Sequence, residues 1–385
     1  MKRRLLLASG CAQCACLAAA SARAQSPAWI APDRFAKPDL ASDEGGLWAL
    51  MDREEVRLRR SPFLLRDPAL REYLQAVACK LGSRHCTDIR VYPVRTPVFN
   101  ASMAPNGMLQ IWSGLLLRVE NEAQLAAVLG HELGHYLQRH TLDQLRDAKA
   151  RSAFMTFMGA FGVVGLIGSL AALATAFGFT RDQERQADAI GLALMRDAGY
   201  DPREASKVWA NLVAETAAAP EGSPWQANPM FATHPAAEER SRTLARLAED
   251  AAGGVVGDVE YAAKLAPVRF GLLEDEVRRG QHGESLVLLD RMVLRAPERA
   301  DLLYFRAEVR RQRQKPGDLE AALADLRGAA ALGNEPPQVH RALGYLYQKF
   351  EQPAAASAEF ARYIELLPNA PDVELIRTYI VEGKT

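Results

Sequence analysis

The chain has 385 residues, of which 49% are hydrophobic and 24% are charged. This length allows two or three domains, and the apolar content is enough to bury a sizeable core. Lysine plus arginine number 47, as do aspartate plus glutamate. The chain therefore has no net charge that would attract nucleic acid or anionic lipid, and we expect no nucleic-acid partner.

The first 24 residues have the pattern of a signal peptide. Positions 2–4 are basic, positions 5–20 are mostly apolar, and Ala22-Arg23-Ala24 matches an A-x-A cleavage site. We therefore expect residues 1–24 to be removed and the mature protein to be exported to the periplasm. A lipoprotein box ending at Cys11 and a twin-arginine signal at Arg3-Arg4 are alternatives that match their patterns less well.

Three of the five cysteines lie in this predicted signal peptide, which leaves Cys79 and Cys86 in the mature chain. In an oxidising compartment, two cysteines at this spacing predict a disulfide. On the chain-entropy model, closing so short a loop stabilises the fold by about 2.5 kcal/mol. Two free buried thiols are the alternative, and the spacing is not the C-x-x-C of a metal site.

A flexible lead, a helical region and a small β-sheet are predicted next. Residues 25–43 are rich in proline, and residues 44–81 predict helices that are interrupted near Pro62 and Pro68. The strand pattern then appears at residues 88–95, 98–103 and 108–112. Pro105-Asn106-Gly107 predicts a hairpin turn between the last two strands.

Two helices with clear end signals follow the strands. Asn121 is a good N-cap residue, and Gln124 stands three positions later, as in a capping box. Apolar residues recur with a helical period up to Leu137, so we expect a helix over residues 121–137. A second helix is predicted over residues 180–198, with Gly199 as the residue that ends it.

The composition changes again after the second helix. We expect a loop at residues 217–229, a linker at residues 251–260 after a domain of residues 44–250, and helical repeats over residues 261–385. The last copy carries the spacing of the tetratricopeptide signature at Leu343-Gly344, Tyr347, Ala356, Phe360 and Pro368. The predicted fold class is α+β, mostly α, with a small β-sheet followed by an α-solenoid of tetratricopeptide repeats. A plain helical bundle is the alternative to the repeats.

The first helix carries the motif His131-Glu132-Leu133-Gly134-His135, an H-E-x-x-H pattern. Residues four apart lie on one helix face, so both imidazoles can bind one zinc ion. Glu132 stands beside them and can act as the general base that takes a proton from a water molecule activated by the metal. Two core histidines are the alternative, but burying both with a glutamate would be costly without a shared task.

Zinc in a catalytic site needs a third protein ligand. A metzincin is excluded because Gln138 and Thr141 stand where that class has glycine and histidine. His140 lies about 140° around a continuous helix from His135 and is expected to point away. Glu184 is the best candidate, and Asp188, one turn later, can accept a hydrogen bond from a ligand imidazole. A solvated helix start is the alternative for this acidic pair.

His234, in Thr233-His234-Pro235, lies in a predicted loop before an amphipathic helix. It can act there as a catalytic group, either a proton donor or an oxyanion stabiliser, or it can approach the zinc as a resting-state ligand. A lone loop histidine with no role is the alternative. We assign the remaining candidates, His85, His282 and His340, to the surface or to packing.

Residues 152–180 carry no charge and are long enough for one transmembrane helix. A single crossing would put His131 and Glu184, two expected ligands of one zinc ion, on opposite sides of the bilayer. We therefore expect a helical hairpin packed over the metal site, with possible contact between its tip and a membrane surface. Simple core packing is the alternative.

Together with Asn100-Ala101 and Gly114-Leu115-Leu116, the His131, Glu184 and His234 motifs resemble the bacterial periplasmic gluzincins related to the CAAX-prenyl endopeptidases. The resemblance covers residues 44–247 well and the repeats more loosely. It implies a zincin-like fold, one zinc ion, endopeptidase activity and a histidine near the metal at the position of His234. It also implies misfolded or stalled outer-membrane proteins as substrates, and contact of the repeats with the outer-membrane assembly machinery.

The sequence thus predicts a periplasmic zinc endopeptidase that degrades misfolded envelope proteins. We expect strand 108–112, with Met108, Gln110 and Trp112, to form a sheet edge that pairs with an extended substrate, which would make specificity loose. The alternative function is a chaperone-like adaptor that binds clients through its repeats and uses zinc structurally. A structural zinc usually has four protein ligands and no adjacent glutamate, so the sequence favours the peptidase.

Overall fold

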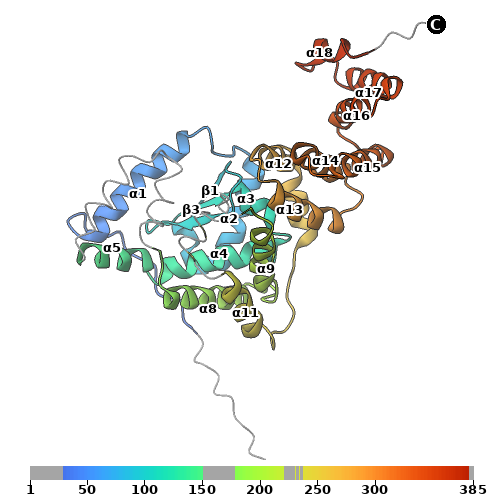
Figure 1. The fold of residues 1–385 in the computed structure, drawn as a ribbon. Helices are drawn as coiled ribbons and strands as arrows, with labels where there is room; N and C mark the ends of the chain where they lie inside the picture. Colours follow the sequence, from blue (N-terminus) through green and yellow to red (C-terminus); the bar gives the residue numbers. More distant parts are fainter. Residues whose placement is uncertain (1–28, 151–177, 221–229, 231–233, 235–236, 381–385) are drawn as a thin grey trace, which may run out of the picture. The chain divides into compact units, whose positions relative to one another are not determined.

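The structure is a computed structural model that describes residues 29–150, 178–220, 230, 234 and 237–380. The chain divides into a short unit, residues 1–31, and a larger unit, residues 32–385, and the elements named below all belong to the larger unit (Figure 1). The predicted signal peptide, residues 152–177 of the apolar run and residues 221–229 of the predicted loop lie outside the described residues.

The first half of the larger unit mixes helices with a small sheet. Its elements are α1 (Asp43–Arg60), α2 (Pro68–Gly82), the 3-10 helix η1 (Ser83–Asp88), β1 (Arg90–Val94), β2 (Ala101–Met103), β3 (Met108–Trp112), α3 (Ser113–Arg118), α4 (Glu122–Leu137), α5 (His140–Ala150), α8 (Arg181–Asp197), α9 (Glu204–Ala217) and α11 (Ala237–Leu247). Helices follow: α12 (Asp258–Arg278), α13 (His282–Arg295), α14 (Ala300–Arg313), α15 (Asp318–Ala331), α16 (Gln338–Lys349), α17 (Pro353–Leu366) and α18 (Val373–Arg377).

The sheet has three strands in the order β1-β3-β2, with β1 parallel and β2 antiparallel to β3. The predicted hairpin between β2 and β3 is confirmed, and it turns at Gly107, whose φ of +88° favours glycine. β3 is central, so the prediction that residues 108–112 form a sheet edge is wrong. The parallel pairing of β1 with β3 is a contact between separate segments, which the alternation within each strand does not encode.

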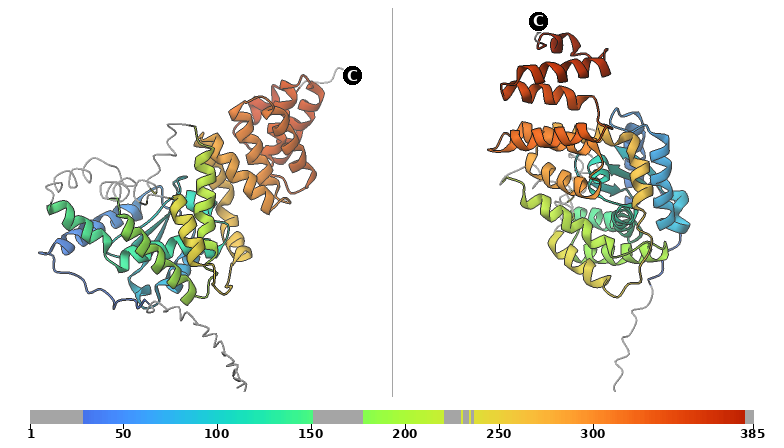
Figure 2. Two further views of the ribbon diagram at one scale, coloured as in Figure 1. Left: turned by 60° about the horizontal axis from the view of Figure 1, so that its bottom comes forward. Right: turned by 90° about the vertical axis from the view of Figure 1, so that its right-hand side faces the viewer.

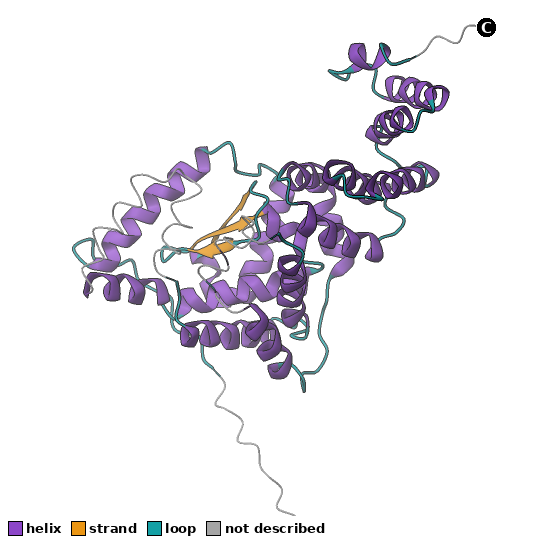
Figure 3. Ribbon diagram, in the orientation of Figure 1, coloured by secondary structure: helices purple, strands orange, loops and turns teal. Residues whose placement is uncertain are grey.

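Helices pack around the sheet (Figure 3). On one side, Met108 and Trp112 of β3 join a buried apolar cluster with Met51 of α1 and Leu142 of α5. Elsewhere α2 contacts β1 and α4 contacts β2. Gln110 is buried as well, so all three side chains expected along a substrate strand are covered by protein. Met108 and Trp112 therefore contribute to the core.

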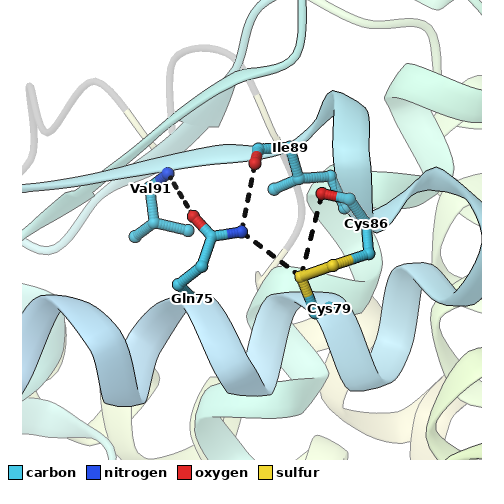
Figure 4. The surroundings of a disulfide bond; sticks show 5 residues. All are labelled: Gln75, Cys79, Cys86, Ile89 and Val91. Atoms are coloured by element: carbon cyan, nitrogen blue, oxygen red, sulfur yellow. Dashed lines mark hydrogen bonds between the residues drawn. A yellow bond between two sulfur atoms is a disulfide. The ribbon is translucent and has the colours of Figure 1, made fainter.

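Cys79 and Cys86 form a disulfide that joins the last turn of α2 to η1 (Figure 4). One turn earlier in α2, the amide of Gln75 donates to the carbonyl of Ile89 at 3.0 Å and accepts from the Val91 N–H at 3.0 Å. These bonds satisfy two backbone groups at the start of β1 that have no strand beside them. The disulfide and Gln75 together fix β1 against α2.

α4 and α8 lie side by side, with backbone nearly touching backbone (Figure 1). A Cβ atom on Gly191 of α8 would lie 2.9 Å from the backbone nitrogen of His131. A Cβ atom on Gly134 of α4 would lie 2.9 Å from the Cα atom of Ala187. Only glycine permits such an approach. The acidic face of α8 is thereby brought next to the histidines of α4.

The helices after residue 258 pack in pairs, α14 with α15 and α16 with α17 (Figure 2). Gly344 of α16 lies so close to the ring of Phe360 that a Cβ atom there would be 2.4 Å from the ring. Both residues belong to the predicted repeat signature, but the assignment to tetratricopeptide repeats stays a prediction.

The predicted linker is not detached from the rest of the unit. The N–H groups of Glu122 and Ala123, at the start of α4, donate to the carbonyls of Gly257 and Val256. The predicted domain boundaries at residues 250 and 261 stay predictions. Among the described helices, none combines the length and apolar composition needed to cross a membrane.

Candidate metal centre

Two histidines of α4 face each other in the interior. Asn121 caps this helix by accepting from the Gln124 N–H at 2.8 Å, as predicted, whereas the Gln124 side chain accepts from Glu120 and not from the cap residue. His131 and His135 stand one turn apart, and both are buried. Their Nε2 atoms are 3.1 Å apart, so both imidazoles point to the same place.

Glu184 reaches this place from the first turn of α8. The helix begins with a capping box between Thr180 and Gln183, which fixes where its first acidic side chains start. Glu184 Oε1 lies 3.3 Å from His135 Nε2. Burial alone would raise the pKa of this carboxyl, but the charges of His234 and His131 outweigh burial and hold its pKa well below the usual range.

His234 is the fourth group at this place. Its Nδ1 atom lies 3.1 Å from His131 Nε2 and 2.7 Å from Glu184 Oε1. The ligand atoms of His131, His135, Glu184 and His234 all lie within 4.8 Å of one another. Tetrahedral ligands at about 2.0–2.1 Å from one zinc ion would be about 3.3 Å apart, so the observed separations fit one metal ion.

Unpaired polar atoms support the same reading. Glu132 Oε1 and Glu184 Oε2 are buried, and neither has a hydrogen-bond partner among the described residues. A buried carboxylate oxygen without a donor is costly unless a cation or a water molecule occupies the space beside it. These residues can therefore hold one metal ion, in agreement with the chemistry of the donor set.

Glu132 lies beside the four groups without being one of them. Its Oε1 atom is 3.7 Å from His234 Nε2. The pKa of Glu132 is raised to about 7, mainly by burial. The charges of His234 and Arg240 and a hydrogen bond from the backbone of Met103 act in the opposite direction and keep the pKa from rising further. A carboxyl group with a pKa near neutrality can both accept and return a proton at neutral pH.

Asp188 lies behind the metal centre, one turn after Glu184. Its Oδ1 atom is 2.9 Å from His131 Nδ1, and Arg240 of α11 donates to both carboxylate oxygens, at 2.5 and 3.0 Å. Burial would raise the pKa of Asp188, but Arg240 and His131 lower it to about 2. The carboxylate is therefore charged and can accept the His131 Nδ1 proton, which leaves Nε2 free to bind a metal.

Arg240 was not identified from the sequence. Its guanidinium is buried, lies 3.6 Å from the ring centroid of Trp209, and places NH1 3.3 Å from Glu184 Oε2. It also approaches His131 Nδ1 to 2.8 Å, but Nδ1 must donate to Asp188 if Nε2 is to bind a metal. The only local signal is the position of Arg240 six residues after His234, in the predicted helix that follows the loop of His234.

His140 also contacts the centre, and the prediction that it points away is wrong. α4 ends at Leu137, and Arg139 has a φ of 59°, so the chain turns before α5 begins. His140 Nδ1 lies 2.9 Å from His135 Nδ1, and His140 Nε2 lies 3.0 Å from Gln186 Oε1. Because an amide oxygen only accepts, His140 donates to Gln186 and accepts from His135, and His135 Nε2 keeps its lone pair.

Described residues pack closely against the centre. The ring of Phe179 stacks on His135 with 3.8 Å between centroids. Phe179 belongs to the described end of segment 152–180, which the sequence predicts to pack over the metal site. Among the pockets lined by described residues, one touches the site at Glu184 and Arg240 and another at Met103 and His135, and each has a volume of about 20 Å³. Such a volume holds a water molecule but not a peptide.

The other histidines of the sequence lie elsewhere. His85 is buried and contacts the rings of Phe35 and Tyr136. His340 lies in α16, where its Nδ1 atom is 2.6 Å from a carboxylate oxygen of Glu359. Neither reaches the metal centre.

Comparison with known proteins finds one matching family model and relatives named as a metalloendopeptidase or a protease. Residues 64–248 match the model of Peptidase family M48. The chain is 33% identical over 156 residues to the mitochondrial metalloendopeptidase OMA1 of Schizosaccharomyces pombe, a match that covers 40% of this chain and 45% of that protein.

Bacterial relatives match over different lengths. Identity to the β-barrel assembly-enhancing protease of Escherichia coli is 27% over 189 residues, which covers 43% of this chain and 38% of that protein. Identity to the protein of the same description from Yersinia pestis is 25% over 399 residues, which covers 89% of this chain and 80% of that protein. The chain spans less than half the length of the fission-yeast and E. coli relatives in these matches.

Proposed function

Residues 64–248 match the model of Peptidase family M48, and from this similarity we propose that the chain is a zinc-dependent endopeptidase. The observation that carries the proposal is the convergence of four ligand atoms within 4.8 Å, with Glu132 beside them. His131, His135 and Glu184 would hold the ion. When bound, zinc would supply Lewis-acid polarisation of the scissile carbonyl and of the attacking water.

In this proposal Glu132 is the general base and then the general acid. Its carboxylate takes a proton from the attacking water and returns it to the nitrogen of the leaving peptide. The pKa of about 7 suits both halves of this task. Asp188 and His140 hold the two ligand imidazoles in the tautomers that present Nε2, and Arg240 keeps Asp188 in place.

The test compares Glu132→Gln with wild type on an unfolded protein substrate. We expect zinc to be retained and cleavage to fall by about 100- to 10,000-fold, because only the proton transfer is removed. Glu238→Gln, an exposed glutamate of α11, is the matched control and should cleave at the wild-type rate. Cleavage at the wild-type rate by Glu132→Gln would refute the peptidase mechanism.

We propose further that His234 is a resting-state ligand that leaves the metal when substrate enters. The support is the position of His234, which is buried and has its Nδ1 atom 2.7 Å from Glu184 Oε1. A fourth protein ligand occupies the coordination position that hydrolysis needs open. His234→Ala should therefore keep zinc, since three ligands remain, and cleave faster. Slower cleavage with zinc retained would instead assign His234 to catalysis.

An extended substrate would pair with β2. This strand contacts α4, and the backbone of its residue Met103 donates a hydrogen bond to Glu132. Asn100 and Ala104 hydrogen-bond β3 through their backbones, so by alternation the backbone groups of Ala101 and Met103 face away from β3. No described strand pairs with that side. Main-chain pairing predicts loose specificity, and a narrow sequence motif across mapped cleavage sites would contradict it.

The cellular setting is proposed from the N-terminus and from the relatives. The predicted signal peptide at residues 1–24 supports export to the periplasm, and the name of the bacterial relatives refers to β-barrel assembly. Unfolded or misfolded envelope proteins would be the substrates, and the helices after residue 258 would contact the outer-membrane assembly machinery. Envelope proteins that accumulate in cells with Glu132→Gln, but not in wild type, would identify the substrates.

The four-ligand arrangement also favours a second candidate function. Structural zinc sites usually have four protein ligands, as His131, His135, Glu184 and His234 would provide here. The chain would then be an adaptor that binds clients through its helices. An adaptor would bind unfolded protein without cleaving it, and His234→Ala would weaken its zinc binding without creating activity.

A further inference from the structure

A groove lies between the segment that leads into α4 and the first helices of the C-terminal part. It is lined by residues 117–120, by α12 and α13, and by the start of α14, and its volume is about 400 Å³. We call it the junction groove. Its volume falls within the range of sites that bind ligands, and it is about twenty times larger than either pocket beside the metal centre.

Arg269 of α12 lines the junction groove, and its Nε atom makes no hydrogen bond to a described residue. Its side chain is 8% exposed, and the Nε atom itself is buried. The nearest carboxylate is that of Asp301, whose Oδ2 atom is 3.5 Å from Arg269 Nε. Asp301 already accepts two hydrogen bonds from Arg299, at 3.0 and 2.9 Å. Buried charges are normally paired, so Arg269 has capacity for an anionic ligand.

The charge of the groove wall agrees with this reading. Five arginines and three carboxylate residues line the groove, and Arg118 and Arg299 are already paired at 3.0 Å or less with carboxylates outside this lining. Glu120 is shared by Arg291 and Arg295, at 3.1 and 2.8 Å. Arg291 also pairs with Glu215 at 2.8 Å, whereas Glu120 is the one carboxylate within 4 Å of Arg295 among the described residues. A ligand with its own carboxylate would complement both sides.

The rest of the lining is apolar. Leu117, Val119, Leu265, Met292 and Leu302 border the groove, and Val259 at its rim is 79% exposed. A carboxylate and an apolar side chain lie next to each other at the C-terminal end of a polypeptide whose last residue is apolar. An internal aspartate or glutamate carries its carboxylate on its own side chain, so no apolar side chain shares the same residue.

We propose that the junction groove binds the C-terminal end of a substrate polypeptide, with the terminal carboxylate on Arg269 and the last side chain against the apolar wall. This inference deepens the proposed peptidase function by assigning a second contact with the substrate. From Glu120 to His131 is eleven residues of α4 and its lead, or about 16 Å. An extended chain anchored in the groove would need about five residues to reach the metal centre.

The test measures peptide binding, and uses Glu132→Gln so that nothing is cleaved. The probe is a short fluorescent peptide of glycine and serine that ends in leucine with a free carboxylate. We expect saturable binding, and about 10- to 100-fold weaker binding of the same peptide with a C-terminal amide, because a charged hydrogen bond is lost. Equal binding of the amide, or better binding of an amidated peptide ending in glutamate, would overturn the proposal.

Two further variants locate the binding. Arg269→Met should lose the preference for the free carboxylate, and Val259→Glu should weaken binding of the leucine peptide by repulsion at an exposed position that does not affect folding. Leu294→Glu is the matched control, since Leu294 is 82% exposed on α13 and does not line the groove. Two results would contradict the proposal. One is unchanged peptide binding by Val259→Glu, and the other is self-association of the wild-type chain that Val259→Glu abolishes. Because binding needs no cleavage, the groove and the peptidase mechanism can fail separately.

Discussion

Two buried clusters of charged groups differ in how completely their members are paired. At the junction of α3, α9 and α12, Arg118 donates to Glu215 at 2.6 Å and to Glu276 at 2.9 and 3.2 Å, and its NH1 group also donates to the Gly114 carbonyl. At the metal centre, Glu132 and Glu184 each keep a buried oxygen with no donor among the described residues. Both clusters are shielded from solvent.

The difference separates a structural role from a functional one. A buried arginine whose nitrogen groups all meet acceptors holds elements together and has no capacity left for a ligand. A cluster of three imidazoles and two carboxylates with unused oxygens is unstable as a purely structural feature, because its unpaired atoms carry a desolvation cost. The cost is relieved when an ion and a substrate bind, which is the property of a site.

The largest predicted effect is on the paired cluster. Arg118→Met should lower the free energy of unfolding by about 3–5 kcal/mol, because Glu215 and Glu276 lose the buried cation that they share and keep only Arg291 and Arg279 at their edge. The measurement is urea denaturation. Arg185→Met removes an exposed pair with Glu239 and should have a much smaller effect. A similar stability for both variants would mean that the Arg118 cluster does not hold the elements together.

The next effect is on the metal centre, where the loss should appear in metal affinity and much less in folding. Glu184→Ala should weaken zinc binding by about 3 kcal/mol, more than 100-fold, as expected for one of three or four ligands. The measurement is competition with a fluorescent chelator. Zinc affinity unchanged from wild type would remove Glu184 from the ligand set.

A large part of the site was predictable because it is local. The helical period places His131, Glu132 and His135 together within one element, and the spacing of four between Glu184 and Asp188 puts both on one face of another. End signals also located the helices, as the residues Asn121 and Gly199 illustrate.

What was missed depends on contacts between elements. His140 returns to His135 because Arg139 adopts a positive φ, and a continuous helix would have carried it away. Arg240 reaches Asp188 from a helix fifty-two residues later, where no local pattern distinguishes it from a solvated arginine. The central position of β3 follows from its pairing with β1, and strand alternation contains no information on the order of strands.

The smallest effects should come from the residues that orient the imidazoles. Asp188→Asn and His140→Phe should each weaken zinc binding by about 10- to 100-fold, because the first removes the negative charge of the acceptor at His131 Nδ1 and the second removes the acceptor at His135 Nδ1. His340→Gln, a histidine of α16 outside the centre, is the control and should bind zinc as wild type does. If Asp188→Asn weakened zinc binding more than Glu184→Ala, the assignment of ligand and supporting residue would have to be exchanged.

The central claim is that this centre holds a catalytic zinc ion, and zinc content per chain after dialysis tests it most directly. Wild type and Glu132→Gln should each retain about one zinc per chain, and His135→Ala should retain almost none. Only wild type among the three should cleave an unfolded protein. A wild-type chain without zinc, or a His135→Ala chain with as much zinc as wild type, would contradict the account.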